Sequence, residues 1–204
     1  MRLLAVSSLG AHFYRLEEGG SGPTTAAALV PDTSFPAYPN ATLGKFAPHS
    51  GRLAVIADPI GLHVVDCATG KEQRLILKST AISAMMFSPR DTYLVTCEKF
   101  VPGEKNLIVW EVATGKEVGL FEWKKGSKEG TKSIKFTEDE SFCARLSAKQ
   151  QIEVYSGGNF VEPYAVLNAN AETLTKKGSK DPAKGKYWFD GFEFIPHNLV
   201  GSSH

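Results

Sequence analysis

The sequence predicts an all-β chain that folds as a partial, open β-propeller of about three to four WD-like blades. Short apolar runs rich in Val, Ile, Phe and Tyr end at turn formers such as Ser88–Asp91 and Thr114–Gly115, as strands joined by tight turns do. The same motifs return at a spacing near 45 residues. That period, with four strands per unit, is typical of propeller blades.

Two motifs carry the repeat. A blade-opening motif at Phe46 returns 41 residues later at Phe87 and a further 49 residues later at Phe136. The turn Ala-Thr-Gly-Lys-Glu occurs at 68–72 and again, 45 residues on, at 113–117. Unrelated hairpins in a sandwich would not explain two such turns, so we interpret the chain as a series of blades.

The chain divides into four predicted segments. They are a partial blade with a proline-rich connector at 1–40, a three-blade core at 41–167, a basic flexible loop at 168–187 and the start of a further, truncated blade at 188–204. We expect the core blades at 41–78, 81–123 and 131–167. The run from Phe189 to Ile195 is expected to be the opening strand of the last blade, which either packs back on the third blade or lies exposed.

Composition limits the class of protein. The 23 basic and 22 acidic residues nearly balance, so a nucleic-acid surface has to be a local patch. Three cysteines without a Cys-x-x-Cys pair argue against a secreted disulfide framework or a zinc site. No apolar run approaches the length of a membrane span or a signal-peptide core. We therefore expect a soluble, cytoplasmic protein with no membrane partner.

No catalytic constellation is found in the sequence. The five histidines lack metal-ligand spacing, and no phosphate-cradling loop occurs, so we expect no catalytic residue, metal or cofactor. His12 and His63, at equivalent positions of two units, are interpreted as structural hydrogen-bonding residues. An enzyme with its site in the central channel of a propeller is the rival from another class, but the repeat positions offer apolar residues there.

Trp110 and Glu111 stand where WD-repeat proteins carry their Trp-Asp pair. The equivalent Tyr155 is followed by Ser156, which has no acidic group. The His-Ser-Trp-Asp hydrogen-bond network of regular WD repeats is therefore not expected in every blade.

Two lysine clusters are the candidate binding residues for RNA or the ribosome. Each holds five lysines against one acidic residue, which is enough to bind phosphates by releasing counterions. Neither contains an aromatic residue for base stacking, so an RNA contact there would ignore sequence. The alternative, that the lysines only keep the surface soluble, stays open. The ten are Lys124, Lys125, Lys128, Lys132, Lys135, Lys176, Lys177, Lys180, Lys184 and Lys186.

From about residue 40 the sequence resembles the N-terminal half of the eukaryotic translation initiation factor 2A family. The resemblance rests on the run from Phe87 to Gly115, on Trp123–Lys125, on Gly158–Phe160 and, most specifically, on the segment Glu138 to Arg145. It implies a many-bladed propeller with a charged helical tail, a non-enzymatic factor that binds the small ribosomal subunit and initiator tRNA, with other initiation factors as further partners. It implies no DNA partner.

On this resemblance we expect an N-terminal fragment or short form of such a factor, acting as a scaffold in translation initiation. The chain ends after about four units, without the tail that the family uses for RNA and partner binding. A WD-like adaptor that binds proteins only, without RNA, is the alternative within the same fold. The sequence leaves open the cause of the ending at His204, the total number of blades and the face that would meet the ribosome.

Overall fold

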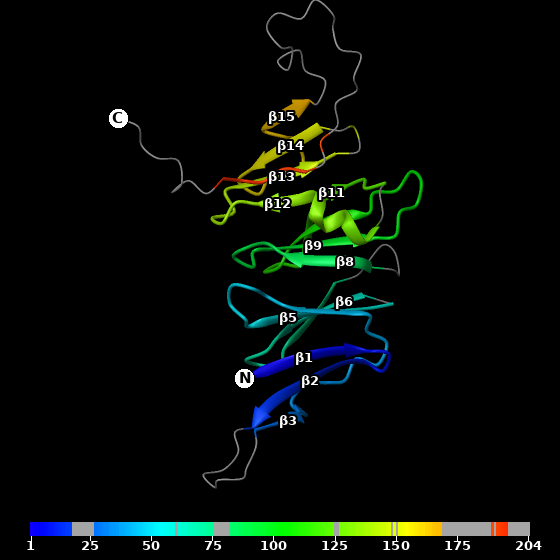
Figure 1. The fold of residues 1–204 in the computed structure, drawn as a ribbon, viewed down its shortest axis with the longest axis vertical. Coiled ribbons are helices and arrows are strands. Elements are labelled where there is room, and N and C mark those ends of the chain that lie inside the picture. The colour runs from blue at the N-terminus through cyan, green and yellow to red at the C-terminus, as the bar shows by residue number, and fades with distance from the viewer. Residues whose placement is uncertain are drawn as a thin grey trace, which may run out of the picture.

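The computed structural model describes residues 1–17, 27–59, 61–75, 82–124, 127–147, 149, 151–168, 189 and 191–195. These residues form four antiparallel sheets that lie one above the next in chain order (Figure 1). Each sheet is a meander in which consecutive strands pair, so each of them is built from one continuous piece of sequence. This arrangement confirms the predicted all-β fold of a partial propeller.

We call the sheets the N-terminal sheet and the first, second and third blades. The N-terminal sheet has three strands, β1 (Arg2–Ser7), β2 (Gly10–Glu17) and β3 (Ala28–Pro31). The first blade has β4 (Leu43–Phe46), β5 (Leu53–Asp58), β6 (Gly61–Asp66) and β7 (Glu72–Leu75). The second has β8 (Ile82–Phe87), β9 (Tyr93–Glu98), β10 (Leu107–Glu111) and β11 (Lys116–Phe121). The third has β12 (Ile134–Phe136), β13 (Phe142–Leu146), β14 (Gln151–Ser156) and β15 (Ala165–Asn168).

The repeated Ala-Thr-Gly-Lys-Glu turns connect the third and fourth strands of the first and second blades. Gly70 and Gly115 both adopt a φ of 68°, a left-handed conformation that costs little only for glycine. A Cβ on Gly115 would also lie 2.2 Å from the side chain of Gln73 in the first blade. The glycine of this turn is therefore required by the left-handed backbone in both blades, and at Gly115 also by the close approach of the first blade.

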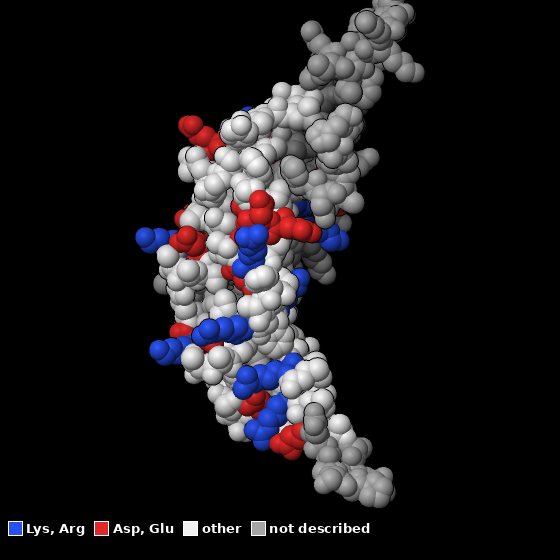
Figure 2. All heavy atoms as spheres, turned by 90° about the vertical axis from the view of Figure 1, so that its left-hand side faces the viewer, with Lys and Arg blue, Asp and Glu red and all other residues white. Residues whose placement is uncertain are grey.

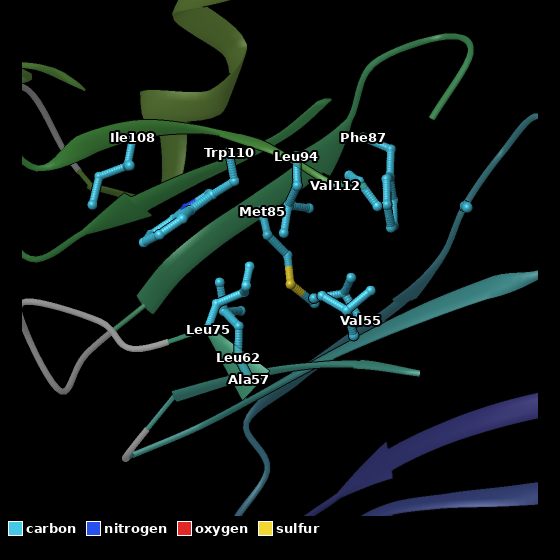
Figure 3. Packing of buried hydrophobic residues seen from close by; sticks show 12 residues of the cluster. Val55, Ala57, Leu62, Leu75, Met85, Phe87, Leu94, Ile108, Trp110 and Val112 are labelled. Carbon is cyan, nitrogen blue, oxygen red and sulfur yellow. The ribbon is translucent and has the colours of Figure 1, made fainter. Parts of the chain in front are cut away.

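Three apolar clusters hold the four sheets together, one for each pair of neighbours. Strand β10 shows how one strand serves two of them, because successive side chains of a strand point to opposite faces. Leu107 and Val109 pack toward the third blade, while Ile108 and Trp110 pack toward the first. Figure 3 shows the cluster between the first and second blades, where Met85 of the second blade points toward Val55 of the first. Full burial of one such side chain is worth roughly 1.5–3 kcal/mol.

Carboxylates in the turn between the first and second strands of a blade bind the corresponding turn of the preceding blade. Asp91 accepts hydrogen bonds from the backbone N–H groups of His49, at 3.1 Å, and Ser50, at 2.7 Å. Glu140, at the equivalent position of the next blade, accepts from the backbone N–H of Arg90 at 2.6 Å. Asp91 and Glu140 have φ values of 64° and 59°, so both positions combine a left-handed backbone with a bond to the neighbouring blade.

The structure departs from expectation at the far end of the chain. Among the described residues, Phe189 and Gly191–Ile195 form no strand, so the expected opening strand is wrong there. The physical reason is the lack of a second strand to pair with in the part of the chain that is described. The predicted loop at 168–187 lies, apart from Asn168, outside the described residues, and the division into segments at residues 40, 167 and 187 stays a prediction. A short 3-10 helix, η1 (Ser127–Ser133), precedes β12 and was not expected.

Candidate interaction surface

The first predicted lysine cluster lies between the second and third blades. Lys124 follows β11 and forms an ion pair with Glu122 at 3.4 Å, while Lys132 is exposed at the end of η1. Lys135, in β12, pairs with Glu193 and lies over the ring of Phe192. Lys128 is described only in its backbone, within η1. Lys125 lies outside the described residues, as does the whole second cluster, Lys176, Lys177, Lys180, Lys184 and Lys186.

Two of the three lysines with described side chains therefore already have a carboxylate partner. Such exposed pairs are weak, typically worth less than about 1 kcal/mol, so they can be exchanged for a phosphate. Figure 2 shows one face of the molecule on which basic and acidic side chains are interspersed rather than gathered into a patch of one sign. This face thus offers single cationic contacts rather than a continuous basic track.

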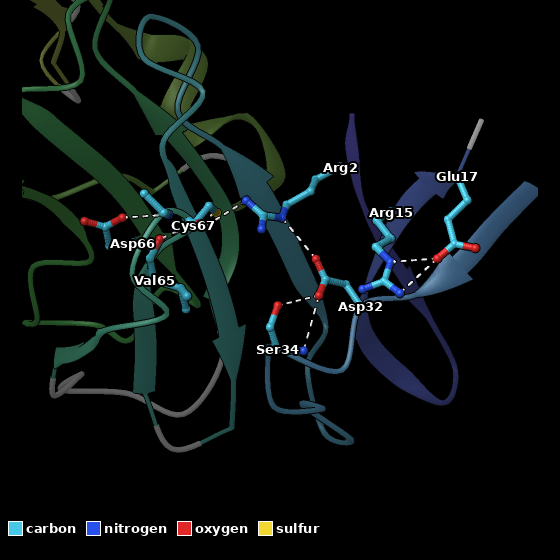
Figure 4. A network of polar contacts seen from close by, with 9 residues as sticks. Arg2, Arg15, Glu17, Asp32, Ser34, Val65, Asp66 and Cys67 are labelled. Atoms are coloured by element: carbon cyan, nitrogen blue, oxygen red, sulfur yellow. Dashed lines mark hydrogen bonds and ion pairs between the residues drawn. The ribbon is translucent and has the colours of Figure 1, made fainter.

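A hollow of about 750 Å³ lies between the N-terminal sheet and the first blade, where sequence reasoning had placed nothing. Arg2 is one of the residues that line it. Its Nε donates to Asp32 at 3.0 Å, and its Nη1 donates to the backbone carbonyl of Cys67 at 2.8 Å (Figure 4). Asp32 also accepts from the backbone N–H of Ser34 at 3.2 Å and from the Ser34 hydroxyl. These bonds hold the pKa of the buried Asp32 carboxyl below its usual value, the Ser34 hydroxyl contributing most.

Arg15 stands directly opposite Arg2 across the β1–β2 pair and lines the same hollow. Two like charges at such a position are unfavourable unless each is neutralised. Arg15 is neutralised by Glu17, which accepts from its Nε at 3.0 Å and its Nη2 at 2.9 Å. Arg2 thus links β1 to the first blade through Cys67, whereas the Arg15–Glu17 ion pair lies within β2, and about half of each arginine side chain is exposed.

A second hollow, of about 540 Å³, lies between β11 and the third blade and contains a buried ion pair. Arg145 Nε donates to Glu153 at 2.8 Å, and the Tyr155 hydroxyl donates to the same oxygen at 2.7 Å. The guanidinium lies 4.3 Å from the centre of the Phe121 ring. Burial first, and then the bond to Glu153, raises the pKa of Tyr155 to about 12. Among the described residues, the buried Arg145 Nη1 has no hydrogen-bond partner.

One signal in the sequence pointed to this pair. Arg145 is aligned with Thr96 of the second blade, so it is a charged residue in the buried strand of a repeat. In the second blade, Thr96 accepts a hydrogen bond from the Trp110 indole at 2.9 Å, which is the Trp–hydroxyl half of a WD network. In the third blade, Arg145 and Tyr155 occupy the two aligned positions, and Glu153 joins them. The expectation that the network does not operate in every blade agrees with this geometry.

The two histidines singled out in the sequence make hydrogen bonds. His63 is nearly buried, and its two ring nitrogens lie 2.7 Å from Asp58 and 2.6 Å from Glu72. Tyr38 donates to Glu72 at 2.9 Å and thereby connects this cluster to the N-terminal connector. His12 lies 3.3 Å from the Leu9 carbonyl. No group of three or more potential metal ligands occurs within the described ranges.

The stacked four-stranded meanders define a protein of the WD40 β-propeller class, a fold typical of protein-interaction scaffolds. No helix in the described part of the chain is long and apolar enough to cross a bilayer. Comparison with known proteins agrees on the fold. The chain superposes on a crystal structure of a eukaryotic initiation factor with a TM-score of 0.64 and 24% identity, over 82% of this chain and 40% of that one.

It also superposes on the C-terminal WD40 domain of Sif2 with a TM-score of 0.53 and 18% identity, over 76% of this chain and 42% of the other. At these identities the likeness establishes the propeller fold and nothing finer. The chain spans about two fifths of the length of each structure. No family model and no curated protein matches the sequence.

Proposed function

We propose that this chain is a non-enzymatic binding scaffold of translation initiation that contacts the small ribosomal subunit and initiator tRNA. The observation that carries the proposal is the superposition on a eukaryotic initiation factor over 82% of the chain, with a higher TM-score than the WD40 domain of Sif2. The sequence resemblance at Glu138 to Arg145 supports the same proposal, and that segment forms a turn and part of strand β13 in the third blade.

The proposed contact uses phosphates and not bases. Lys124 and Lys132 are exposed on the connection between the second and third blades, and the sequence of the first lysine cluster, residues 124–135, contains no aromatic residue. Each neutralised phosphate releases counterions, so such binding weakens steeply as salt rises.

Co-sedimentation of the purified chain with small ribosomal subunits tests the proposal. At low ionic strength, where the Debye length is about 30 Å at 0.01 M salt, we expect the chain in the ribosomal pellet and a progressive release as salt is added. The control is the same run without subunits, which detects aggregates. Absence from the pellet at low salt contradicts a role on the ribosome.

The second candidate function is a protein-interaction adaptor that binds no RNA. One observation favours it: two of the three described cluster lysines are already paired, Lys124 with Glu122 and Lys135 with Glu193. The same sedimentation series separates the two functions, since an adaptor leaves the subunits alone at every salt concentration.

A further inference from the structure

Within the described residues, the N-terminal sheet has one strand fewer than each blade. Three sheets contain four strands, whereas the described part of the N-terminal sheet contains β1, β2 and β3 only. The pairing register identifies the vacant position. Ser7 pairs with Gly10 at the β1–β2 turn as Asp58 pairs with Gly61 at the β5–β6 turn, so β1 corresponds to the second strand of a blade. The position of a first strand, beside the free edge of β1, is vacant within the described residues.

The opposite end of the stack carries a segment of the complementary kind. Phe192, Phe194 and Ile195 occupy the places that Met85, Phe87 and Ser88 have at the start of the second blade. The segment lies against the third blade: Glu193 pairs with Lys135 of β12, and Lys135 lies 5.8 Å from the centre of the Phe192 ring. Figure 1 draws it alongside β12 and β13. First strands β8 and β12 likewise pack on the blade before them.

Each end of the stack also presents an apolar sheet face. Leu3 and Leu29 are 41% and 50% exposed, and strand alternation directs them away from the first blade. At the other end, Phe142 and Leu167 are 38% and 52% exposed on the face of the third blade that points away from the second. Elsewhere in the molecule such faces are buried between blades.

We propose that two copies of this chain close into one ring. Residues 191–195 of one copy serve as the first strand of a composite blade whose other three strands are β1, β2 and β3 of the second copy. The N-terminal sheet of the second copy then covers the open face of the third blade. Residues 191–195 of one copy then form backbone hydrogen bonds with the open edge of β1 of the other copy. This pairing covers a strand edge that would otherwise favour aggregation.

Within the described residues, the N-terminal sheet and the third blade lie at opposite ends of the stack (Figure 1), so a single copy does not bring the two parts together. With three complete blades and one composite blade per copy, the ring has eight blades, within the usual range of about four to eight. The contact is head-to-tail, and it closes because the second copy repeats it at the other end.

Single substitutions at the two ends test the proposal in the full chain. Leu3→Glu and Leu167→Glu place a charge on exposed positions of the two end faces, so each copy still folds, but the charge would be buried in the ring. Leu9→Glu is the matched control, an apolar residue 76% exposed at the β1–β2 turn and away from both faces. The measurement is size-exclusion chromatography with light scattering over a range of concentrations, with circular dichroism to verify the fold.

We expect a discrete dimer for the unchanged chain and for Leu9→Glu. Each of the two face variants should raise the dimer dissociation constant by at least about tenfold. In an equal mixture of Leu3→Glu and Leu167→Glu, a mixed dimer has one contact between two unchanged end faces and one contact between two changed faces. The mixture should therefore associate more tightly than either variant alone. A monomeric unchanged chain overturns the proposal. So does a dimer weakened by only one of the two variants, because a head-to-tail ring needs both faces, and so does an open series of oligomers.

Discussion

At the scale of single residues, the blades are connected by polar contacts as well as by apolar packing. The carboxylate of Asp91 receives two backbone N–H groups of the preceding turn, and Arg2 bridges Asp32 and the Cys67 carbonyl. These bonds fix how far one sheet is displaced relative to the next, which apolar packing alone leaves adjustable. The same residues are therefore where substitutions should act between blades rather than within them.

Asp91→Ala tests the bond between turns. The variant removes an acceptor for the N–H groups of His49 and Ser50 and places alanine at a φ of 64°, so we expect a loss of about 2 kcal/mol in the free energy of unfolding. Asp91→Asn is the control, because asparagine tolerates a left-handed backbone and retains one acceptor oxygen. Urea denaturation provides the measurement. A change within about 0.5 kcal/mol for the alanine variant means that the bond between turns contributes little.

The Trp110–Thr96 bond is tested by a double-mutant cycle. Both residues are buried, and the indole N–H donates to the Thr96 hydroxyl at 2.9 Å. Trp110→Phe and Thr96→Val should each destabilise by about 1–2 kcal/mol, since each leaves one buried polar group unpaired. The double variant leaves neither group, so its loss should be about 1 kcal/mol smaller than the sum of the two. Simple additivity would show that the two side chains act independently.

Acid should destabilise the protein through Asp66 and Asp139. The Arg52 guanidinium lowers the pKa of Asp66 to about 2, and the hydroxyls of Thr137 and Ser141 lower the pKa of Asp139 to about 2, from an ordinary 3.8. A lowered folded-state pKa contributes stability that is present above pH 3.8 and is lost as pH falls toward 2.

Urea midpoints at pH 5, 3 and 2 should therefore fall steeply for the unchanged chain, across the interval between the ordinary and the lowered pKa of these two carboxyls. In the variant Asp66→Asn/Asp139→Asn they should fall less. Arg15→Gln, which leaves both aspartates in place, serves as the control and should keep the full acid dependence. Equal acid sensitivity in all three proteins would assign the effect to other carboxyls.

At the scale of elements, the sequence predicted what depends on local patterns. The strand-turn rhythm located the blades because Gly70 and Gly115 impose the same turn in the first and second blades. The alternation along β10 assigns Leu107 and Val109 to one face of the second blade and Ile108 and Trp110 to the other. Both are properties of consecutive residues. Because successive side chains of a strand point to opposite faces, the alternation in the sequence directly predicts the two faces of the strand.

What the sequence could not predict depends on partners far along the chain. The hollow with Arg2 and Arg15 needs Asp32 and Cys67, which come from other elements. The cluster of Tyr38, His63 and Glu72 likewise joins a connector to a blade. The segment at 191–195 carries an opening-strand motif but forms no strand among the described residues, because a motif does not provide the strand it must pair with.

The lysine cluster between the second and third blades carries a prediction at this scale. Lys124→Glu/Lys125→Glu/Lys128→Glu should weaken binding to unrelated RNAs by the same factor and flatten the salt dependence, because contacts to phosphates carry no sequence information. Lys45→Glu/Lys71→Glu/Lys99→Glu, three exposed lysines elsewhere, is the matched control for net charge. Fluorescence anisotropy with two RNAs of unrelated sequence measures both effects. A selective loss for one RNA would contradict the proposed backbone contact.

At the scale of the whole molecule, stability is shared between neighbours. Each sheet packs only against the sheets beside it. The first and second blades therefore have an apolar cluster on both faces, whereas the two end sheets have one on a single face. We propose residues 41–167 as the ordered core on this ground. Phe13 of the N-terminal sheet and Tyr38 of the connector contribute to a third apolar cluster, which extends the packed unit toward the N-terminus.

Hydrogen exchange followed by mass spectrometry at two protein concentrations tests the stacked arc most directly. We predict that β5, β9 and β10, whose residues are almost all buried, exchange most slowly at both concentrations. The amides of β1 that point away from β2, and those of residues 191–195, should gain protection in the concentrated sample, where the ring forms. Inner strands that exchange as fast as β1 at every concentration would contradict the account, because the sheets would then not be stacked as propeller blades.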